Sequence, residues 1–243
     1  MPIAENFTSF YSHKRTIDFT QCLPNGHLRL TDLCNLLQLA AGDHAEMGGI
    51  SFSDMQAYQQ AWVLSRMRVE ILELPKWKDK VTIKTWIVSL ENSRSVRALE
   101  MYAGDRKIVG CETFWAVFNT ASRRPEALAL PHEHFEKFAD DFSTNERTSK
   151  VDLYDLDIKL ADHKVLISDL DIVNHANNVK YLEWCLDQFD PEVLMANRIQ
   201  SIDMNFMKEL VLDDVVEIKA DVQQRTFGIL KDDKACFGLK ISC

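Results

Sequence analysis

A repeated order of secondary structure, one helix followed by four strands in each half, most constrains the fold of this chain. In the first half, apolar residues recur at helical spacing over residues 31–45, where Thr31 or Asp32 is the expected N-cap. Alternating runs rich in Val, Ile, Trp and Phe then predict strands at residues 62–72, 80–88, 95–102 and 109–119.

The second half repeats this order. A strand is expected at residues 164–168 and a helix at 177–189. Further strands are predicted at residues 201–208, 214–223, 225–231 and 234–242. Local similarity supports the repeat, because PKWKDKVTIK resembles ELVLDDVVEIK and NGH precedes the first helix as VNH precedes the second.

This order predicts an α+β fold in which each half wraps an antiparallel sheet around one helix. Two such halves are expected to pack as a pseudo-dimer. Residues 122–150 lose the alternation and become polar, so they favour a connection between modules. We therefore predict an N-terminal module over residues 1–130, a linker over 131–150 and a C-terminal module over 151–243.

The charge of the chain limits its partners. The 243 residues include 28 Lys and Arg against 37 Asp and Glu, a net charge of −9, which disfavours nucleic acid binding. Residues 61–124 carry 12 basic against 7 acidic residues, which suits either an acidic protein partner or an ordinary solvated strand face. Six cysteines without a CxxC pair or metal-ligand spacing, and no signal peptide or membrane span, predict a cytoplasmic protein without metal.

Residues 168–184, SDLDIVNHANNVKYLEW, contain the most informative motif. Asp171, Asn174, His175 and Asn178 crowd the start of an apolar helix. Such residues often do no more than cap a helix, because its first N–H groups need acceptors. The same free N–H groups can also stabilise an oxyanion, so the segment is a candidate catalytic site.

This motif resembles the signature of acyl-acyl carrier protein (ACP) thioesterases of plants and bacteria, Asp-x-Asn-x-His-x-Asn-Asn-x-Lys-Tyr, in the second of two hotdog modules. The stretches PKWKD and FWAVFNTASRRP resemble further parts of that family, so the likeness covers most of residues 7–243. It implies a tandem, or double, hotdog fold.

The resemblance also implies roles for individual residues. Asp171 and His175 match the Asp and His of the motif, and Glu209 matches the catalytic Glu that lies 34 residues after the His. Glu209 would act as general base on water, His175 would position water or protonate the leaving thiolate, and Asp171 would orient the imidazole.

Two positions depart from the family pattern. Val173 stands where the family has its catalytic Asn, so either Asn174 supplies that amide or the amide is dispensable, with backbone N–H groups near Ala176 or Asn177 binding the oxyanion. Leu210 stands where plant members commonly have Cys, which excludes a cysteine nucleophile there. Asn174 or Asn178 is expected to hold the carbonyl oxygen.

The first module implies other functions. His27 reads as a degenerate copy of His175, since no Asn pair follows it and Pro75 stands at the position of Glu209. By resemblance, this module holds the acyl chain, whose predicted lining residues could equally be ordinary core: Leu36, Leu37, Ala40, Met67 and Trp86. The predicted docking residues for the acidic carrier protein are Arg66, Arg68, Lys76, Lys78, Arg123 and Arg124.

The leading prediction is a hydrolase of fatty acid biosynthesis that cleaves fatty acyl-ACP thioesters by activated water and needs no cofactor. Its partner would be ACP with the acyl chain on 4'-phosphopantetheine. The alternatives are an acyl-CoA thioesterase or a hotdog protein that binds acyl chains without cleaving them. The sequence does not determine the chain length, the saturation, or whether the protein is a monomer or a homodimer.

Overall fold

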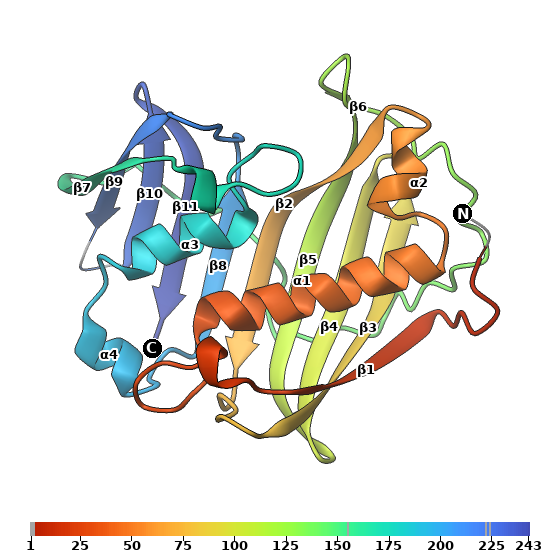
Figure 1. The fold of residues 1–243 in the computed structure, drawn as a ribbon, viewed down its shortest axis with the longest axis horizontal. Helices are drawn as coiled ribbons and strands as arrows, with labels where there is room; N and C mark the ends of the chain where they lie inside the picture. Colours follow the sequence, from red (N-terminus) through yellow and green to blue (C-terminus); the bar gives the residue numbers. More distant parts are fainter. Residues whose placement is uncertain (1–2, 155, 222, 224) are drawn as a thin grey trace.

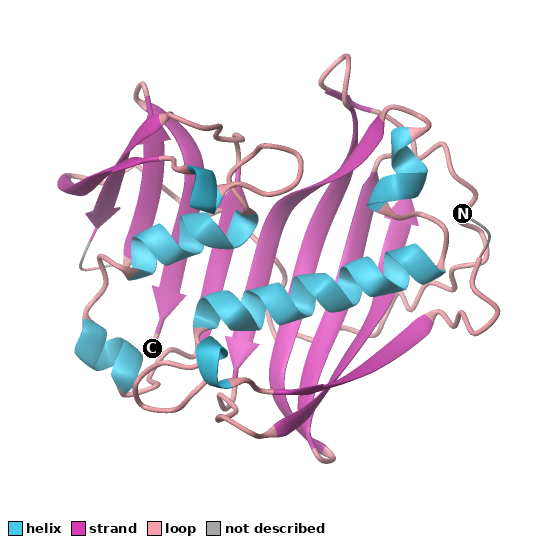
Figure 2. Cartoon of the chain, viewed as in Figure 1, coloured by secondary structure: helices cyan, strands magenta, loops and turns pink. Residues whose placement is uncertain are grey.

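One antiparallel sheet forms the body of the protein, described here in a computed structural model at residues 3–154, 156–221, 223 and 225–243 (Figure 2). The N-terminal module contains β1 (Phe10–Thr16), a 3-10 turn (Phe19–Gln21), α1 (Leu30–Met47), α2 (Phe52–Gln56), β2 (Gln60–Ile71), β3 (Lys80–Glu91), β4 (Arg94–Ala103), β5 (Arg106–Asn119) and β6 (Arg124–Pro125). The C-terminal module contains β7 (Ile158–Lys164), a 3-10 turn (Ile167–Asp169), α3 (Asn178–Leu186), α4 (Pro191–Met195), β8 (Ser201–Phe206), β9 (Val215–Asp221), β10 (Thr226–Lys231) and β11 (Lys234–Ser242).

The strand order has a mirror relation about its centre. It runs β1-β3-β4-β5-β2 through the first module and β8-β11-β10-β9-β7 through the second, while the short β6 pairs only with β5. The central strands β2 and β8 pair from Arg66 opposite Asn205 to Glu70 opposite Ser201. The two modules therefore share one continuous sheet, as two subunits of a symmetric dimer would.

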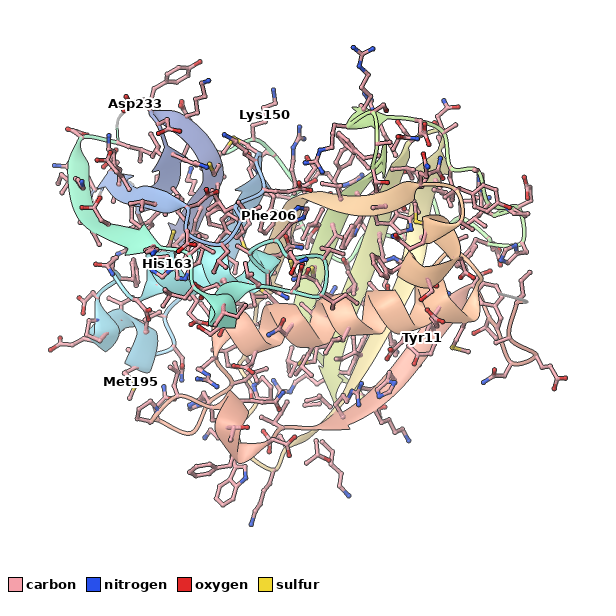
Figure 3. The ribbon with its side chains drawn as sticks, turned by 45° about the horizontal axis from the view of Figure 1, so that its top comes forward. Tyr11, Lys150, His163, Met195, Phe206 and Asp233 are labelled. Carbon is pink, nitrogen blue, oxygen red and sulfur yellow. The ribbon has the colours of Figure 1, made fainter. Side chains whose placement is uncertain are left out.

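Both long helices lie on the same face of the sheet, where α1 crosses the strands of the first module and α3 those of the second (Figure 1). Their apolar sides enter the main core, with Leu33, Leu37 and Leu182 fully buried. Aromatic side chains on the edge strands pack on the helices: Tyr11 stacks on His44 and His163 on Trp184, at centroid distances of 5.7 Å and 4.1 Å (Figure 3).

The opposite face of the sheet is covered by the connection between the modules. Phe138 of this connection packs against Trp86, and the Trp86 indole donates to the carbonyl of Asp141. A Cβ on Gly110 would lie 2.0 Å from the Ser143 carbonyl oxygen, so only glycine allows this close approach. These layers confirm the predicted tandem hotdog fold.

Several local predictions were wrong. The first helix starts at Leu30 with Arg29 as N-cap, instead of Thr31 or Asp32. The strand expected at residues 164–168 is β7, which ends at Lys164 and leads into a 3-10 turn. The strands and helices that the periodicity did not predict are β1, α2, β6 and α4. Edge strands such as β1 and β7 are largely exposed, so they lack the apolar alternation of a half-buried strand.

The boundaries of the modules stay predictions. Residues 131–150 contain no helix or strand, yet they are held closely, since Phe135 is fully buried and Ser143 is 3% exposed. The predicted strand at 214–223 is observed to Asp221, and position 222 lies outside the described residues. Among the described helices, not one has the length and apolar character needed to cross a membrane.

Candidate active site

The start of α3 and the connection between β8 and β9 are tied together by three hydrogen bonds. The Ala176 N–H donates to the Leu210 carbonyl over 2.8 Å. The Tyr181 hydroxyl accepts from the Leu210 N–H over 2.9 Å and donates to the Lys208 carbonyl over 3.4 Å. Burial raises the pKa of Tyr181, which keeps this hydroxyl protonated. Glu209, between Lys208 and Leu210, is thereby fixed against the helix start.

His175 and Glu209 meet at this junction. The His175 Nε2 lies 3.6 Å from the Glu209 Oε2, and their side chains are 29% and 31% exposed. The same carboxylate oxygen accepts a hydrogen bond from Nη2 of Arg123, which lies in the turn between β5 and β6. The carboxylate thus receives an imidazole from its own module and a guanidinium from the other.

Asp171 fixes the main chain of the loop. Its Oδ1 accepts from the N–H groups of Val173 and His175, at 2.9 Å and 3.3 Å, and its own N–H donates to the His175 carbonyl. The described hydrogen bonds of its carboxylate are to backbone groups, so orientation of the ring by Asp171 stays a prediction. Asp171 holds the loop in the shape that presents His175.

The described donors available for an oxyanion differ from those expected. The Ala176 and Asn177 N–H groups are already bonded to the Leu210 and Asp169 carbonyls, so these two are not free to bind an oxyanion, and a donor near them stays a prediction. Asn178, the first residue of α3, has no described partner for its N–H, while its side-chain amide donates to Gln38 of α1 over 3.2 Å. Asn174 is exposed and has a φ of +61°. Its N–H donates to the Asp171 carbonyl, and this hydrogen bond closes the turn.

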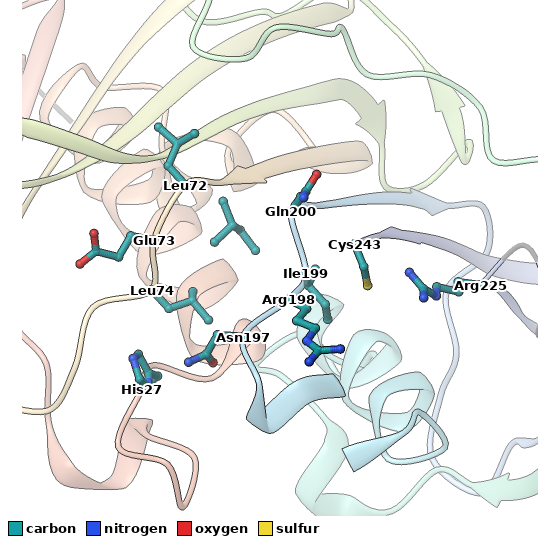
Figure 4. A pocket seen from close by; sticks show the side chains of 11 residues that line it. His27, Leu72, Glu73, Leu74, Asn197, Arg198, Ile199, Gln200, Arg225 and Cys243 are labelled. Atoms are coloured by element: carbon teal, nitrogen blue, oxygen red, sulfur yellow. The ribbon is translucent and has the colours of Figure 1, made fainter. Parts of the chain in front are cut away.

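The first module has the same backbone arrangement without the carboxylate. The Leu28 N–H donates to the Pro75 carbonyl as the Ala176 N–H does to Leu210, so Pro75 corresponds to Leu210. Leu74 therefore stands at the position of Glu209. The sequence alone places Pro75 there, which is one residue too far along the chain. His27 and Leu74 both line a cavity of about 600 Å³ at this position (Figure 4).

The residues predicted to line the acyl chain pocket belong to two different environments. Four of them are buried in the main core: Leu36, Leu37, Ala40 and Met67. Trp86 packs against the connection between the modules on the opposite face of the sheet, so it is withdrawn from the predicted lining. A second cavity, of about 430 Å³, lies between α1, α2 and the sheet, with Gln38 and Trp62 in its wall and none of these five residues.

The predicted docking residues do not form one surface. Arg68 is 7% exposed and bonds Asp203 over 2.5 Å and Glu70 over 3.0 Å, so its docking role is wrong. Lys76 and Lys78 follow the end of β2, whereas Arg123 and Arg124 follow β5 at the start of β2. The 12 residues of β2 separate these groups by about 36 Å. Arg66, in the middle of β2, packs its guanidinium over Phe114.

Sequence reasoning missed two contributions. Tyr181 is in the motif, but only the fold shows that its hydroxyl holds the Glu209 segment. Gln38 gave no signal, because its role follows from α1 touching α3.

Comparison with known proteins adds a second line of evidence. Family models of the acyl-ACP thioesterase N-terminal and C-terminal domains match residues 8–136 and 145–235. A chloroplastic oleoyl-ACP thioesterase of Coriandrum sativum is 28% identical over 76% of this chain and 55% of its own length. A chloroplastic palmitoyl-ACP thioesterase of Cuphea hookeriana is 28% identical over 75% of this chain and 48% of its own length.

Solved structures share the whole fold. An acyl-ACP thioesterase from Bacteroides thetaiotaomicron superposes with a TM-score of 0.87 at 24% identity, covering 96% of this chain and 97% of that one. A 12:0-ACP thioesterase from Umbellularia californica gives a TM-score of 0.79 at 18% identity, covering 97% of both chains. The chain spans about half the length of the two plant relatives it matches in sequence.

Proposed function

This chain belongs to the acyl-ACP thioesterase family, and from that premise we propose that it hydrolyses fatty acyl-ACP thioesters to free fatty acid and holo-carrier protein. The observation that carries the proposal is the contact between the His175 imidazole and the Glu209 carboxylate at the start of α3. A nearby cavity, which shares Gln38 with that helix start, offers room for an acyl chain.

The proposed chemistry uses water as the nucleophile. Glu209 takes a proton from water while the water oxygen bonds to the thioester carbonyl carbon, giving a tetrahedral oxyanion. When this intermediate collapses, the carbon–sulfur bond breaks and the proton passes through His175 to the leaving thiolate. Nε2 and Oε2 lie 3.6 Å apart, so this transfer requires the two side chains to approach to hydrogen-bond distance when substrate binds. The Arg123 guanidinium orients the carboxylate, leaving Oε1 to face the water.

Asn178 is the proposed oxyanion donor. Its N–H is at the first position of α3, where the helix dipole also favours negative charge. Its side-chain amide, held by Gln38, supplies a second donor. Asn174 keeps its proposed alternative role as a donor from the exposed loop.

The test is release of free thiol from one acyl group carried either on ACP or on CoA. Hydrolysis at a higher kcat/KM from ACP supports the proposal, whereas preference for CoA would assign an acyl-CoA thioesterase. Absence of thiol release from both, with retained binding of the acyl chain, would make the protein a non-catalytic binder. A His175→Ala protein serves as the blank for hydrolysis by contaminants.

Carrier docking is proposed at the turn between β5 and β6, beside the site, with Arg124 and Arg66 as the contacts that remain besides Arg123. Arg124→Glu should raise the KM for acyl-ACP several-fold and leave hydrolysis of acyl-CoA unchanged, because ACP is acidic. Lys78→Glu, at the far end of β2, is the matched control. An equal effect of both substitutions would contradict this docking surface.

A role in fatty acid biosynthesis and a cytoplasmic location are proposed with this activity. Whether the chain acts as a monomer or a homodimer stays open to measurement of its mass in solution.

A further inference from the structure

The cavity between α1, α2 and the sheet lies in the N-terminal module, whose elements are longer than those of the C-terminal module. Helix α1 has 18 residues and α3 has 9, and β4 has 10 residues against 6 in β10. The cavity wall includes Ala41, Gly42, Ala45 and Glu46, all in the half of α1 beyond the length of α3. Its volume of about 430 Å³ falls within the range of small-molecule pockets.

An arginine without a carboxylate partner lies in the wall of this cavity. Arg97 is 5% exposed, and its Nη1 donates to the His44 Nδ1 over 2.7 Å and to the Thr85 hydroxyl over 3.3 Å. The described residues provide no acid within ion-pair distance of its guanidinium. Burial lowers the pKa of Arg97 to about 10, so the group is charged at neutral pH.

The histidine beside Arg97 does not compensate this charge. The His44 Nε2 lies 2.9 Å from the Thr8 carbonyl and donates to it, which leaves Nδ1 as the acceptor for Arg97. Burial, followed by the charge of Arg97, lowers the pKa of His44 to about 3. His44 is therefore neutral, and Arg97 is a buried charge balanced only by dipoles, which is costly without further acceptors.

Arg97 also has donors to spare. A guanidinium carries five N–H groups, and the described bonds of Arg97 are made by Nη1 alone. Ser95 lies two residues before it on β4, hence on the same face of the strand, and also lines the cavity. The Ser95 hydroxyl, in a residue 5% exposed, has no hydrogen-bond partner among the described residues.

The two indole N–H groups of the wall already have acceptors. The indole N–H groups of Trp62 and Trp115 donate to the Ile50 carbonyl and the Thr113 hydroxyl, at 3.0 Å and 2.9 Å. An unsubstituted hydrocarbon chain in this cavity would cover Arg97 and Ser95 without offering an acceptor. Such burial of unpaired donors costs free energy.

We propose that the cavity selects acyl chains that carry a hydroxyl or keto oxygen, which accepts hydrogen bonds from Arg97 and Ser95. The inference rests on the proposed function, in which the acyl chain enters this cavity from the start of α3. Asp43 and Glu46 also line the cavity, so its titratable side chains sum to a negative charge and favour a neutral oxygen over a carboxylate.

The position of the oxygen follows from the helix. Gln38 marks the end of the cavity near the site, and His44, which holds Arg97, lies six residues further along α1, about 9 Å away. A fully extended chain advances about 1.2 Å per bond, judged from the extended polypeptide, so this distance corresponds to about seven bonds. The oxygen is therefore expected in the middle or distal part of the chain.

The test compares dodecanoyl-ACP with hydroxydodecanoyl-ACP substrates whose hydroxyl is moved from the middle to the end of the chain. The best hydroxylated substrate should exceed the plain chain in kcat/KM by about 10- to 100-fold, the range for a hydrogen bond to a charged donor. Arg97→Met should abolish this preference, and Arg94→Met, an exposed arginine on the same strand, should retain it. Equal kcat/KM for plain and hydroxylated chains in the unmodified protein would overturn the proposal.

Additional variants and substrates distinguish failure of the cavity proposal from failure of the proposed hydrolysis. If Arg97→Met does not fold, Ser95→Ala should reduce the preference in part, and an unchanged preference would count against the site. A chain ending in a carboxylate that outperforms all hydroxylated chains would overturn the choice of a neutral oxygen. If no substrate is hydrolysed, the proposed function fails, and equal affinity of the protein for dodecanoic and hydroxydodecanoic acid would then overturn this inference as well.

Discussion

The two modules build the same loop before their helices but equip it with different side chains. The Leu23 N–H donates to the His27 carbonyl in the first module, and the Asp171 N–H donates to the His175 carbonyl in the second. Both loops turn through a residue with positive φ, Gly26 at +81° and Asn174 at +61°. The shared backbone shows that the loop shape belongs to the fold, since it persists where Leu74 stands at the position of Glu209.

A few side chains place the proposed chemistry in the second module. Leu74 occupies the place of Glu209, and the backbone N–H of Leu210 is held by the Tyr181 hydroxyl. The first module has instead the longer helix and strands, and with them the cavity proposed for the acyl chain. Under the proposed function, one module keeps the catalytic groups while the other is enlarged around the substrate cavity.

The centre of the sheet shows a similar division. The backbone N–H groups of Leu72 and Met207 each donate to a carbonyl near the end of the neighbouring strand, so these two residues occupy equivalent positions in their modules. Arg68 and Asp203 each lie four residues earlier, so they are equivalent as well. They pair directly across β2 and β8. In a dimer of identical modules this position would face its own copy, whereas the fused chain places opposite charges there.

The largest difference between the modules should appear in catalysis. Glu209→Gln and His175→Ala should each lower kcat by about 10²- to 10⁴-fold, as expected for loss of an acid–base group. His27→Ala in the first module should leave kcat within a few-fold of the unmodified value. Thiol release under saturating substrate measures all three, and equal losses at His27 and His175 would refute the division of labour.

The ion pair between the modules should dominate stability. Arg68→Ala leaves the Asp203 carboxylate, in a residue 7% exposed, without its guanidinium and should cost about 3–5 kcal/mol in the free energy of unfolding. The double substitution Arg68→Met with Asp203→Leu should recover part of that loss, because the Asp203 charge is removed as well, whereas Glu70 still loses its guanidinium partner. Urea unfolding provides the measurement, and a double variant less stable than the single would show that the pair itself is strongly favourable.

Tyr181 tests whether the fixed position of Glu209 matters. Tyr181→Phe removes the bonds to Leu210 and Lys208 and should lower kcat by about 10- to 100-fold through misplacement of the carboxylate. Because Tyr181 positions Glu209 without touching substrate, KM should change little. Tyr102→Phe, on β4, is the control for loss of a tyrosine hydroxyl, and a rise in KM with constant kcat would assign Tyr181 to binding instead.

The most gradual effect concerns pH and arises in the first module. The pKa of His44 is lowered to about 3, so between that value and its ordinary 6.5 the unfolded chain binds a proton that the folded chain does not. Stability should therefore fall as the pH falls below 6.5, by at most about 1.4 kcal/mol per pH unit. His44→Gln should flatten this slope and His132→Gln should not. Equal slopes for the two variants, from denaturant titrations at several pH values, would contradict the assignment.

The sequence alone determined the repeated helix-and-strand order and the positions of most buried strands. The strand at 234–242 was predicted to its ends, because its alternation comes from one buried face. The motif around His175 pointed to the start of α3, since polar groups at a helix entry form a local pattern. Exposed edge strands such as β1 left no such pattern, so they escaped prediction.

Only the tertiary structure decided which side chains meet. Arg123 reaches Glu209 across 86 positions of sequence, and Gln38 reaches Asn178 across 140. It also placed all five predicted lining residues outside the cavity proposed for the acyl chain and buried Arg68 at the module boundary. Periodicity reports on neighbours along one element, whereas such contacts depend on how distant elements pack, so no local pattern carries them.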